Sequence, residues 1–141
     1  MRARAREGGS GIKTTYRFSI PRLPSPALSP NARAHWSKVR KAKVADGEDA
    51  YASFLSAFPK PSSPFKKASI AVTVYFKASR TRDLDNWNAR MIGIWNGLKG
   101  WLFVDDSYDC IGQPKFTFIV DKTKAPLMEI VIKEESVDAD I

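Results

Sequence analysis

Four aspartates in two close pairs are the residues of this sequence best suited to chemistry. Asp83 and Asp85 are separated by one residue, and Asp105 and Asp106 follow about twenty residues later. On extended backbone, residues two apart project to the same face, about 6.6 Å apart along the strand, so one cation can bridge the first pair. Clustered carboxylates repel each other, and a bound ion relieves that repulsion. Because carboxylate oxygens are hard ligands, the pattern predicts a site for Mg²⁺, or for Mn²⁺, rather than for Zn²⁺.

The segment between the two pairs is predicted to be an amphipathic helix. Asp85 is a good N-cap residue, and Gly100 supplies a C-terminal stop. Apolar residues recur between them at three- and four-residue intervals: Trp87, Met91, Ile94 or Trp95, and Leu98. Gly93 and Gly97 each disfavour the helix by up to about 1 kcal/mol, so the apolar stripe must stabilise it. Such a helix could return the chain beside its start, and the two pairs could then converge.

The order RDLDN, a helix, and an apolar run ending in VDDS resembles the signature of the RusA-type Holliday junction resolvases. The upstream segment SPNARAHWSKVRKAK also resembles the N-terminal element of that family, and the resemblance spans roughly residues 20–133. It implies a dimeric, Mg²⁺-dependent endonuclease that cuts four-way DNA junctions. Its catalytic, metal-binding aspartates would be Asp83, Asp85 and Asp106, with Asp105 as a further ligand or an acid just behind the ligands.

One position departs from the family pattern. A lysine usually stands four residues after the second aspartate, where this chain has Ala89, followed by Arg90. Arginine does not give up a proton near neutral pH, so it is not an equivalent replacement. Three interpretations stay open: Arg80, Arg82 or Arg90 supplies the charge, the enzyme cuts slowly, or the chain binds junctions without cutting them.

The positive charge lies in the first part of the chain. Residues 1–60 hold 12 Lys and Arg against 4 Asp and Glu, whereas residues 61–141 hold 11 of each. A basic region beside an acidic metal site suits a phosphodiester substrate, although the same charge could simply form a solvated surface. The candidate DNA-binding residues are Arg33, Lys38, Arg40, Lys41 and Lys43, together with Arg80, Arg82 and Arg90 near the aspartates.

Composition favours one small domain. The chain has 141 residues, 43% hydrophobic residues and a single cysteine, Cys110, which fits a reducing cytoplasm. The family resemblance implies a bacterial or phage-encoded, nucleoid-associated protein. It contains neither an apolar run near 18 residues nor a signal-peptide pattern. We expect residues 1–12 to be a basic flexible tail, 13–134 to form the endonuclease-like domain, and 135–141 to be an acidic frayed tail.

The predicted fold is α/β or α+β, with a mixed sheet of about four strands and two main helices. Alternating apolar residues predict strands at 15–20 and 67–77, and the strands at 115–120 and 127–133 are expected to form a terminal hairpin. Residues 21–30 contain four prolines and are expected to be extended. A helix is predicted over 31–57, starting at Ser29 and Pro30, with Gly47 as a possible break.

Other residues leave alternatives open. In the first helix, the predicted buried side comprises Trp36, Val39, Tyr51, Phe54 and Leu55, yet Trp36 is also the tryptophan that could instead stack on a base. His35 is expected to be packed or solvent-facing, with a phosphate contact as the alternative. A homodimer would match the two-fold symmetry of a junction, through either the apolar face of the central strand or the tryptophan-rich helix.

Three other functional interpretations compete with the nuclease. Asp85 could merely cap a helix while Asp105 and Asp106 form a turn. A metal-free nucleic-acid-binding module would share the basic half without needing the acids. A structural or interaction protein would show no preference for branched DNA.

Overall fold

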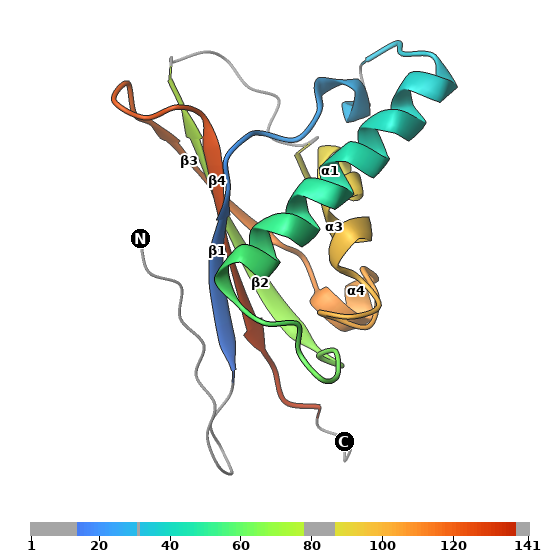
Figure 1. The fold of residues 1–141 in the computed structure, drawn as a ribbon, viewed down its shortest axis with the longest axis vertical. Helices are drawn as coiled ribbons and strands as arrows, with labels where there is room; N and C mark the ends of the chain where they lie inside the picture. The colour runs from blue at the N-terminus through green and yellow to red at the C-terminus, as the bar shows by residue number, and fades with distance from the viewer. Residues whose placement is uncertain (1–13, 31, 78–86, 138–141) are drawn as a thin grey trace.

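A four-stranded mixed sheet covered on one face by helices forms the protein, as Figure 1 shows. This computed structural model describes residues 14–30, 32–77 and 87–137. The strands are β1 (Thr15–Ile20), β2 (Ala68–Phe76), β3 (Lys115–Val120) and β4 (Leu127–Glu134), in the order β1-β4-β2-β3. The helices are α1 (Trp36–Ala57), α2 (Trp87–Arg90), α3 (Ile92–Leu98) and α4 (Tyr108–Ile111), with a 3₁₀ turn η1 (Pro26–Leu28). The predicted α+β class is confirmed.

The inward faces of the first two strands are as predicted. Tyr16, Phe18 and Ile20 of β1 are buried, and so are the alternate residues of β2 from Ala68 to Phe76. Their neighbours Arg17 and Ser69 are exposed on the other face, because successive side chains of a strand point to opposite sides. Helices cover the first of these faces (Figure 1).

The predicted terminal hairpin is wrong. β3 pairs with β2 in parallel, whereas β4 is antiparallel to both β1 and β2 and lies between them. A parallel pair needs a long crossover, and the segment between β2 and β3 that contains α2, α3 and α4 provides it. The buried side chains of β4, Met128, Ile130 and Ile132, explain its central position, since a central strand is covered on its inner face along its whole length. Just beyond the end of β4, the backbone N–H of Glu135 donates to the carbonyl of Lys67.

Helix α1 differs from the prediction at its start and in its middle. It begins at Trp36 and not at Ser29 and Pro30, because the Nδ1 atom of His35 accepts a hydrogen bond from the Ser37 backbone N–H at 3.1 Å and so caps it. The proline-rich segment before it contains η1 and is not fully extended. Gly47 does not interrupt the helix, which runs for 22 residues. Of the predicted buried side, only Phe54 is fully buried. Val39 and Leu55 are partly buried, and Trp36 and Tyr51 are exposed.

The helix predicted over residues 85–100 is divided into α2 and α3 at Met91. The hydrogen bonds from Met91 N to Trp87 O, at 3.1 Å, and from Trp95 N to Met91 O, at 2.9 Å, carry the helical path across this junction. The apolar stripe is buried as predicted, from Trp87 to Leu98. Gly100 follows α3 with φ +91°, a left-handed conformation that glycine adopts readily, which confirms it as the stop.

The backbones of α1 and α3 meet at three glycines. A Cβ atom on Gly97 would lie 2.3 Å from the carbonyl oxygen of Gly47 and 2.5 Å from its Cα, and one on Gly93 would lie 2.9 Å from the Asp46 Cβ. Only glycine permits such an approach. These glycines weaken helix propensity, but they allow α1 to cross α3 at backbone contact.

Neither surface predicted for a dimer interface is available in this fold. The apolar face of β2 and the apolar stripe of α2 and α3 are both buried against other parts of the same chain. A dimer would therefore need another surface. Among the described residues, no helix is long and apolar enough to cross a membrane.

We expect Gly97→Ala to destabilise the protein, although alanine is the better helix former by up to about 1 kcal/mol. The added methyl group must push α1 and α3 apart, which should lower the free energy of unfolding by about 1–3 kcal/mol. Urea denaturation followed by circular dichroism measures this change. Asn96→Ala, at an exposed neighbouring position of the same helix, is the control and should leave stability unchanged or slightly raised. A Gly97→Ala protein as stable as the wild type would contradict the close contact.

Candidate functional site

Of the two acidic pairs, the structure describes only Asp105 and Asp106. Asp83 and Asp85 lie outside the described residues, as do Arg80 and Arg82. Asp105 is exposed, whereas the carboxylate of Asp106 lies 3.5 Å from the Nζ atom of Lys99. Within the described ranges, no group of three or more His, Cys, Asp and Glu side chains could hold a metal ion.

The described neighbours of the two pairs lie far apart. Trp87, the first described residue after Asp85, packs its ring 5.7 Å from Phe76 at the C-terminal end of β2. On the other side, Val104 donates to the carbonyl of Phe65, which precedes the start of β2. The 12 residues from Trp87 to Leu98 span about 17 Å at 1.5 Å per residue. The described chain therefore approaches the two pairs from opposite ends of α2 and α3.

Three of the predicted DNA-binding residues share one pocket. Arg33, Lys38 and Lys41 are exposed and line a cavity of about 660 Å³ between the first turns of α1 and the segment around η1. Among the residues that the structure describes, the rest of the lining is Ser25, Pro26 and alanines, and none of them is acidic. We call this cavity the cationic pocket. The three cations favour an anion, since they are the only charged residues in the described part of the lining.

The other predicted cations are placed differently. Arg40 is exposed on α1 but does not line the cationic pocket. The Arg90 guanidinium donates to the carbonyl of Pro24 at 2.6 Å and lies 4.5 Å from the ring centre of Trp87. These contacts support the proline-rich segment, which is a structural role for Arg90 that the sequence did not indicate.

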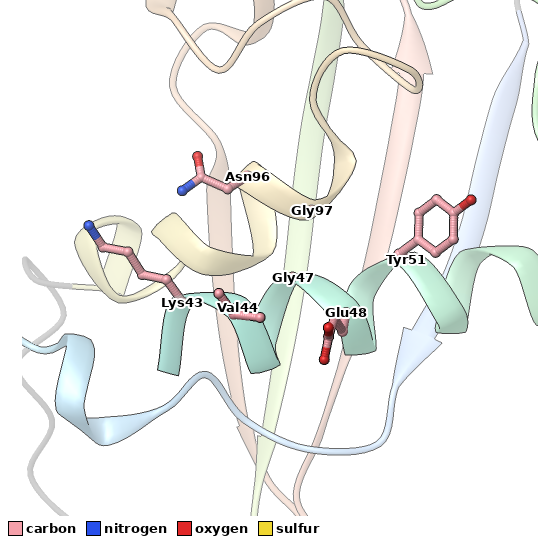
Figure 2. A pocket seen from close by; sticks show the side chains of 7 residues that line it. All are labelled: Lys43, Val44, Gly47, Glu48, Tyr51, Asn96 and Gly97. Carbon is pink, nitrogen blue, oxygen red and sulfur yellow. The ribbon is translucent and has the colours of Figure 1, made fainter. Parts of the chain in front are cut away.

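Lys43 belongs to a second pocket, of about 410 Å³, where α1 crosses α3 (Figure 2). Gly47 and Gly97 lie at its centre, and Glu48 and Tyr51 line its other parts. Because one lysine is offset by one glutamate, this second pocket shows no preference for anions.

A buried carboxylate holds the wall of the cationic pocket in place. Asp46 of α1 is only 1% exposed, and its oxygens accept hydrogen bonds from the Ser25 backbone N–H at 2.9 Å and the Ser25 hydroxyl at 2.5 Å. The Arg22 guanidinium also pairs with Asp46, and with Asp49 at 2.6 Å. Burial alone would lower the pKa of Arg22, but the hydrogen bond to Asp49 and the charges of Asp46 and Asp49 outweigh it and raise that pKa.

Two aromatic side chains stand at the start of α1, and neither of them lines the cationic pocket. Trp36 is 68% exposed, and its ring centre lies 5.4 Å from that of His35. Trp87 and Trp95 are buried, as predicted for core tryptophans, and Trp101 is partly buried. The exposure of Trp36 contradicts its predicted place on the buried side of the helix, and base stacking by Trp36 stays a prediction.

Sequence reasoning missed Asp46 and Lys99. Asp46 is the first acid after a run of cations in the same helix, and this isolated position was a usable signal. Its partners Arg22 and Ser25 lie more than 20 residues away, so no local pattern connects them. Lys99 stands seven residues before Asp106, and no sequence pattern linked the two residues.

Neither a scan against protein-family models nor a search of curated proteins returned a match to this sequence.

We expect Asp46→Asn to lower the free energy of unfolding by about 1–3 kcal/mol, because the amide places a donor among the donors of Ser25 and Arg22 in a buried site. Chemical denaturation of the two proteins measures the difference. Asp49→Asn is the matched control, since Asp49 pairs with the same arginine but is exposed, and its loss should cost about 1 kcal/mol or less. Equal effects of the two substitutions would refute the special role of Asp46.

Proposed function

We propose that this chain is a Mg²⁺-dependent endonuclease that cuts branched DNA, in the manner of the RusA-type resolvases whose signature it resembles. The observation that carries the nucleic-acid part is the cationic pocket, where Arg33, Lys38 and Lys41 meet and none of the described lining residues is acidic. The nuclease part rests on the spacing of Asp83, Asp85, Asp105 and Asp106.

The pocket suits a phosphodiester backbone. Arginine and lysine side chains that neutralise phosphates release counterions, and this release supplies much of the affinity for nucleic acids. Three cations in one cavity would fix the register of a strand against α1. Phosphate contacts of this kind carry no sequence information, which agrees with an enzyme that selects DNA by its shape.

The described acids fit a hard divalent ion. Asp105 is exposed, and the side chain of Asp106 is 27% exposed and held by an ion pair that a stronger cation could displace. Together with Asp83 and Asp85 they would hold the Mg²⁺, which would polarise a phosphoryl oxygen and favour deprotonation of a bound water. Because the described chain approaches the two pairs from opposite ends of α2 and α3, the proposal requires that the pairs meet at one ion, either within one chain or across a dimer.

Lys99 is our candidate for the charge that the family lysine would supply. Its ammonium group already lies beside Asp106, whereas the guanidinium of Arg90 is engaged with Pro24. Before an ion binds, the ion pair with Lys99 holds the Asp106 carboxylate in position. If Asp106 bound a metal ion instead, the same ammonium group would become available to a phosphate.

Mg²⁺-dependent nicking of a synthetic four-way junction tests the proposal. We expect Asp85→Asn and Asp106→Asn each to abolish nicking while leaving junction affinity unchanged or improved, since each removes a negative charge. Asp109→Asn, an exposed acid three residues beyond Asp106, is the control and should keep wild-type activity. Absence of nicking by the wild type would refute the nuclease.

Mixing the two inactive variants then tests how the pairs cooperate. If one chain supplies Asp85 and its partner supplies Asp106, a mixture of Asp85→Asn and Asp106→Asn proteins will regain nicking through mixed dimers. If one chain supplies both, the mixture will stay inactive. Sedimentation of the wild type establishes whether the proposed homodimer forms.

Lys99→Met should slow nicking by roughly 100-fold, because one positive group near the developing charge is removed. Its affinity for the junction in the absence of metal should stay within about twofold of the wild type. Ala89→Lys in the same chain should recover part of the lost rate if Lys99 replaces the family lysine. Lys122→Met, an exposed lysine between β3 and β4, is the control. Normal nicking by Lys99→Met would exclude this role.

A junction-binding protein that does not cut is the second candidate, and Ala89 favours it. Such a protein would bind four-way junctions in preference to duplexes of the same length, and the aspartate substitutions would change no activity. A protein without a nucleic-acid function would show no such preference at moderate salt.

A further inference from the structure

Strand β3 forms an edge of the sheet that carries none of the features that usually protect a sheet edge. The sheet order places β3 beside β2 alone, and no described strand pairs with its other side. After Lys115 its residues are Phe-Thr-Phe-Ile-Val, without a charge or a proline, and its register with β2 is unbroken. The other edge strand, β1, carries the exposed Arg17 in its middle, and such a charge discourages pairing with a further strand. The outer edge of β3 is therefore suited to accept a strand.

The side chains of β3 leave apolar surface uncovered on both faces of the sheet. Ile119 is 39% exposed on the face away from the helices, and Val120 is 48% exposed on the helical face. Phe116 and Phe118 also lie on the helical face, where they are only partly buried and their ring centres are 6.2 Å apart. A neighbouring strand would cover these four side chains, because opposite residues of paired strands have Cβ atoms about 4.5–5.5 Å apart.

The backbone groups that point away from β2 can be assigned from one hydrogen bond. The N–H of Asp121 donates to the carbonyl of Phe76, the last residue of β2, at 2.8 Å. Successive residues of a strand turn their backbone groups to opposite sides, so every second residue before Asp121 also faces β2. The residues that turn their N–H and C=O groups outward are Phe116, Phe118 and Val120. None of them is proline, so each can both donate and accept.

We propose that β3 pairs antiparallel with β3 of a second copy of this chain, with the two-fold axis at Phe118. In this register Phe118 faces its own counterpart, and Phe116 faces Val120 of the partner subunit. The outward residues then exchange both backbone hydrogen bonds at each of these pairs. The two sheets become one continuous sheet, and the exposed apolar side chains are covered. This interface would serve the homodimer of the proposed function, but it requires no cleavage.

Charge complementarity selects a second copy as the partner. Lys115 is the first residue of β3, and Asp121 directly follows the last. With the axis at Phe118, Lys115 lies opposite Asp121 of the partner subunit, and the symmetry repeats this pair at the other end. Hydrogen bonds from Thr123 lower the pKa of Asp121, so its carboxylate is ionised at neutral pH. Opposite charges directly across two strands stabilise their pairing.

The nearest alternative registers fit less well. Opposite residues must share a face of the sheet, so the axis can move only by whole residues. With the axis at Thr117, Val120 would face Pro114 of the partner subunit, which has no N–H to donate. With the axis at Ile119, the pairing would run past the end of β3. Either shift also separates the two charges.

Sedimentation velocity of the wild type and of Val120→Lys tests the interface. We expect the wild type to be dimeric at micromolar concentrations and Val120→Lys to be monomeric there, because the new ammonium group would face Phe116 of the partner subunit. Val44→Lys is the matched control, since Val44 is 55% exposed on α1 and the same substitution there should leave the dimer intact. Circular dichroism verifies that the variants are folded.

A mixing experiment tests the register without touching an apolar residue. Lys115→Glu alone and Asp121→Lys alone each place like charges opposite each other at both ends. Each should raise the dissociation constant roughly 5-fold for each pair and about 25-fold for the two. An equimolar mixture should regain association close to that of the wild type, because the mixed dimer again has opposite charges at both positions. With one variant labelled with ¹⁵N, native mass spectrometry distinguishes mixed dimers from dimers of one kind.

Three results would overturn the inference: a monomeric wild type, a Val120→Lys protein that dimerises as well as the wild type, or a mixture no more associated than its two components. The nuclease proposal fails separately. A dimer formed through β3 that never nicks a junction keeps this interface and loses the proposed enzyme, whereas a monomer that nicks junctions keeps the enzyme and loses the interface.

Discussion

The contact between the backbones of α1 and α3 is the constraint on which the rest of the structure depends. Gly47 and Gly97 meet where a side chain on either would collide with the other helix, and Gly93 faces Lys43 and Asp46 in the same way. This close approach places Asp46 in the interior, although α1 is otherwise a basic and largely exposed helix. Buried carboxylates need compensating partners, and Arg22 and Ser25 of the proline-rich segment provide them. The packing of α1 against α3 thus determines where the proline-rich segment is attached.

The attachment of that loop creates the candidate site. With Ser25 fixed to Asp46 and Pro24 fixed to Arg90, the segment around η1 forms a wall opposite the first turns of α1. Arg33, Lys38 and Lys41 then face one cavity, whereas they would otherwise point into solvent from separate turns. The two charged groups that build the wall, Asp46 and Arg90, are separate from the cations that would contact phosphate. Substitution of a lining cation can therefore change binding without removing the contacts that hold the wall.

The sequence predicted those features that depend on local patterns. Alternation in β1 and β2, the apolar stripe of α2 and α3 and the stop at Gly100 follow from neighbouring residues, and the structure agrees with each. The sheet order could not be predicted, because β4 lies between β1 and β2 through pairings across more than 50 residues. The role of Gly47 was also misjudged, since the same residue type breaks a helix or allows close packing, and only the partner helix decides. The cations were found from composition, but their gathering into one pocket depends on Asp46.

Helices α2 and α3 lie between the two parts of the proposed site, the cationic pocket and Asp106. Arg90, in α2, touches the loop that forms the cationic pocket, while Lys99, just beyond the other end, holds Asp106. The path from Arg90 to Lys99 is about 14 Å along the helices, which corresponds to about four nucleotide steps of 3.4 Å along one strand of a duplex. A single DNA arm lying along α2 and α3 would therefore meet the pocket and Asp106 at different phosphates. An enzyme arranged in this way would hold its substrate at one position and act at another, so that the path of the DNA between the two, and not the sequence of its bases, would decide which molecules are cut.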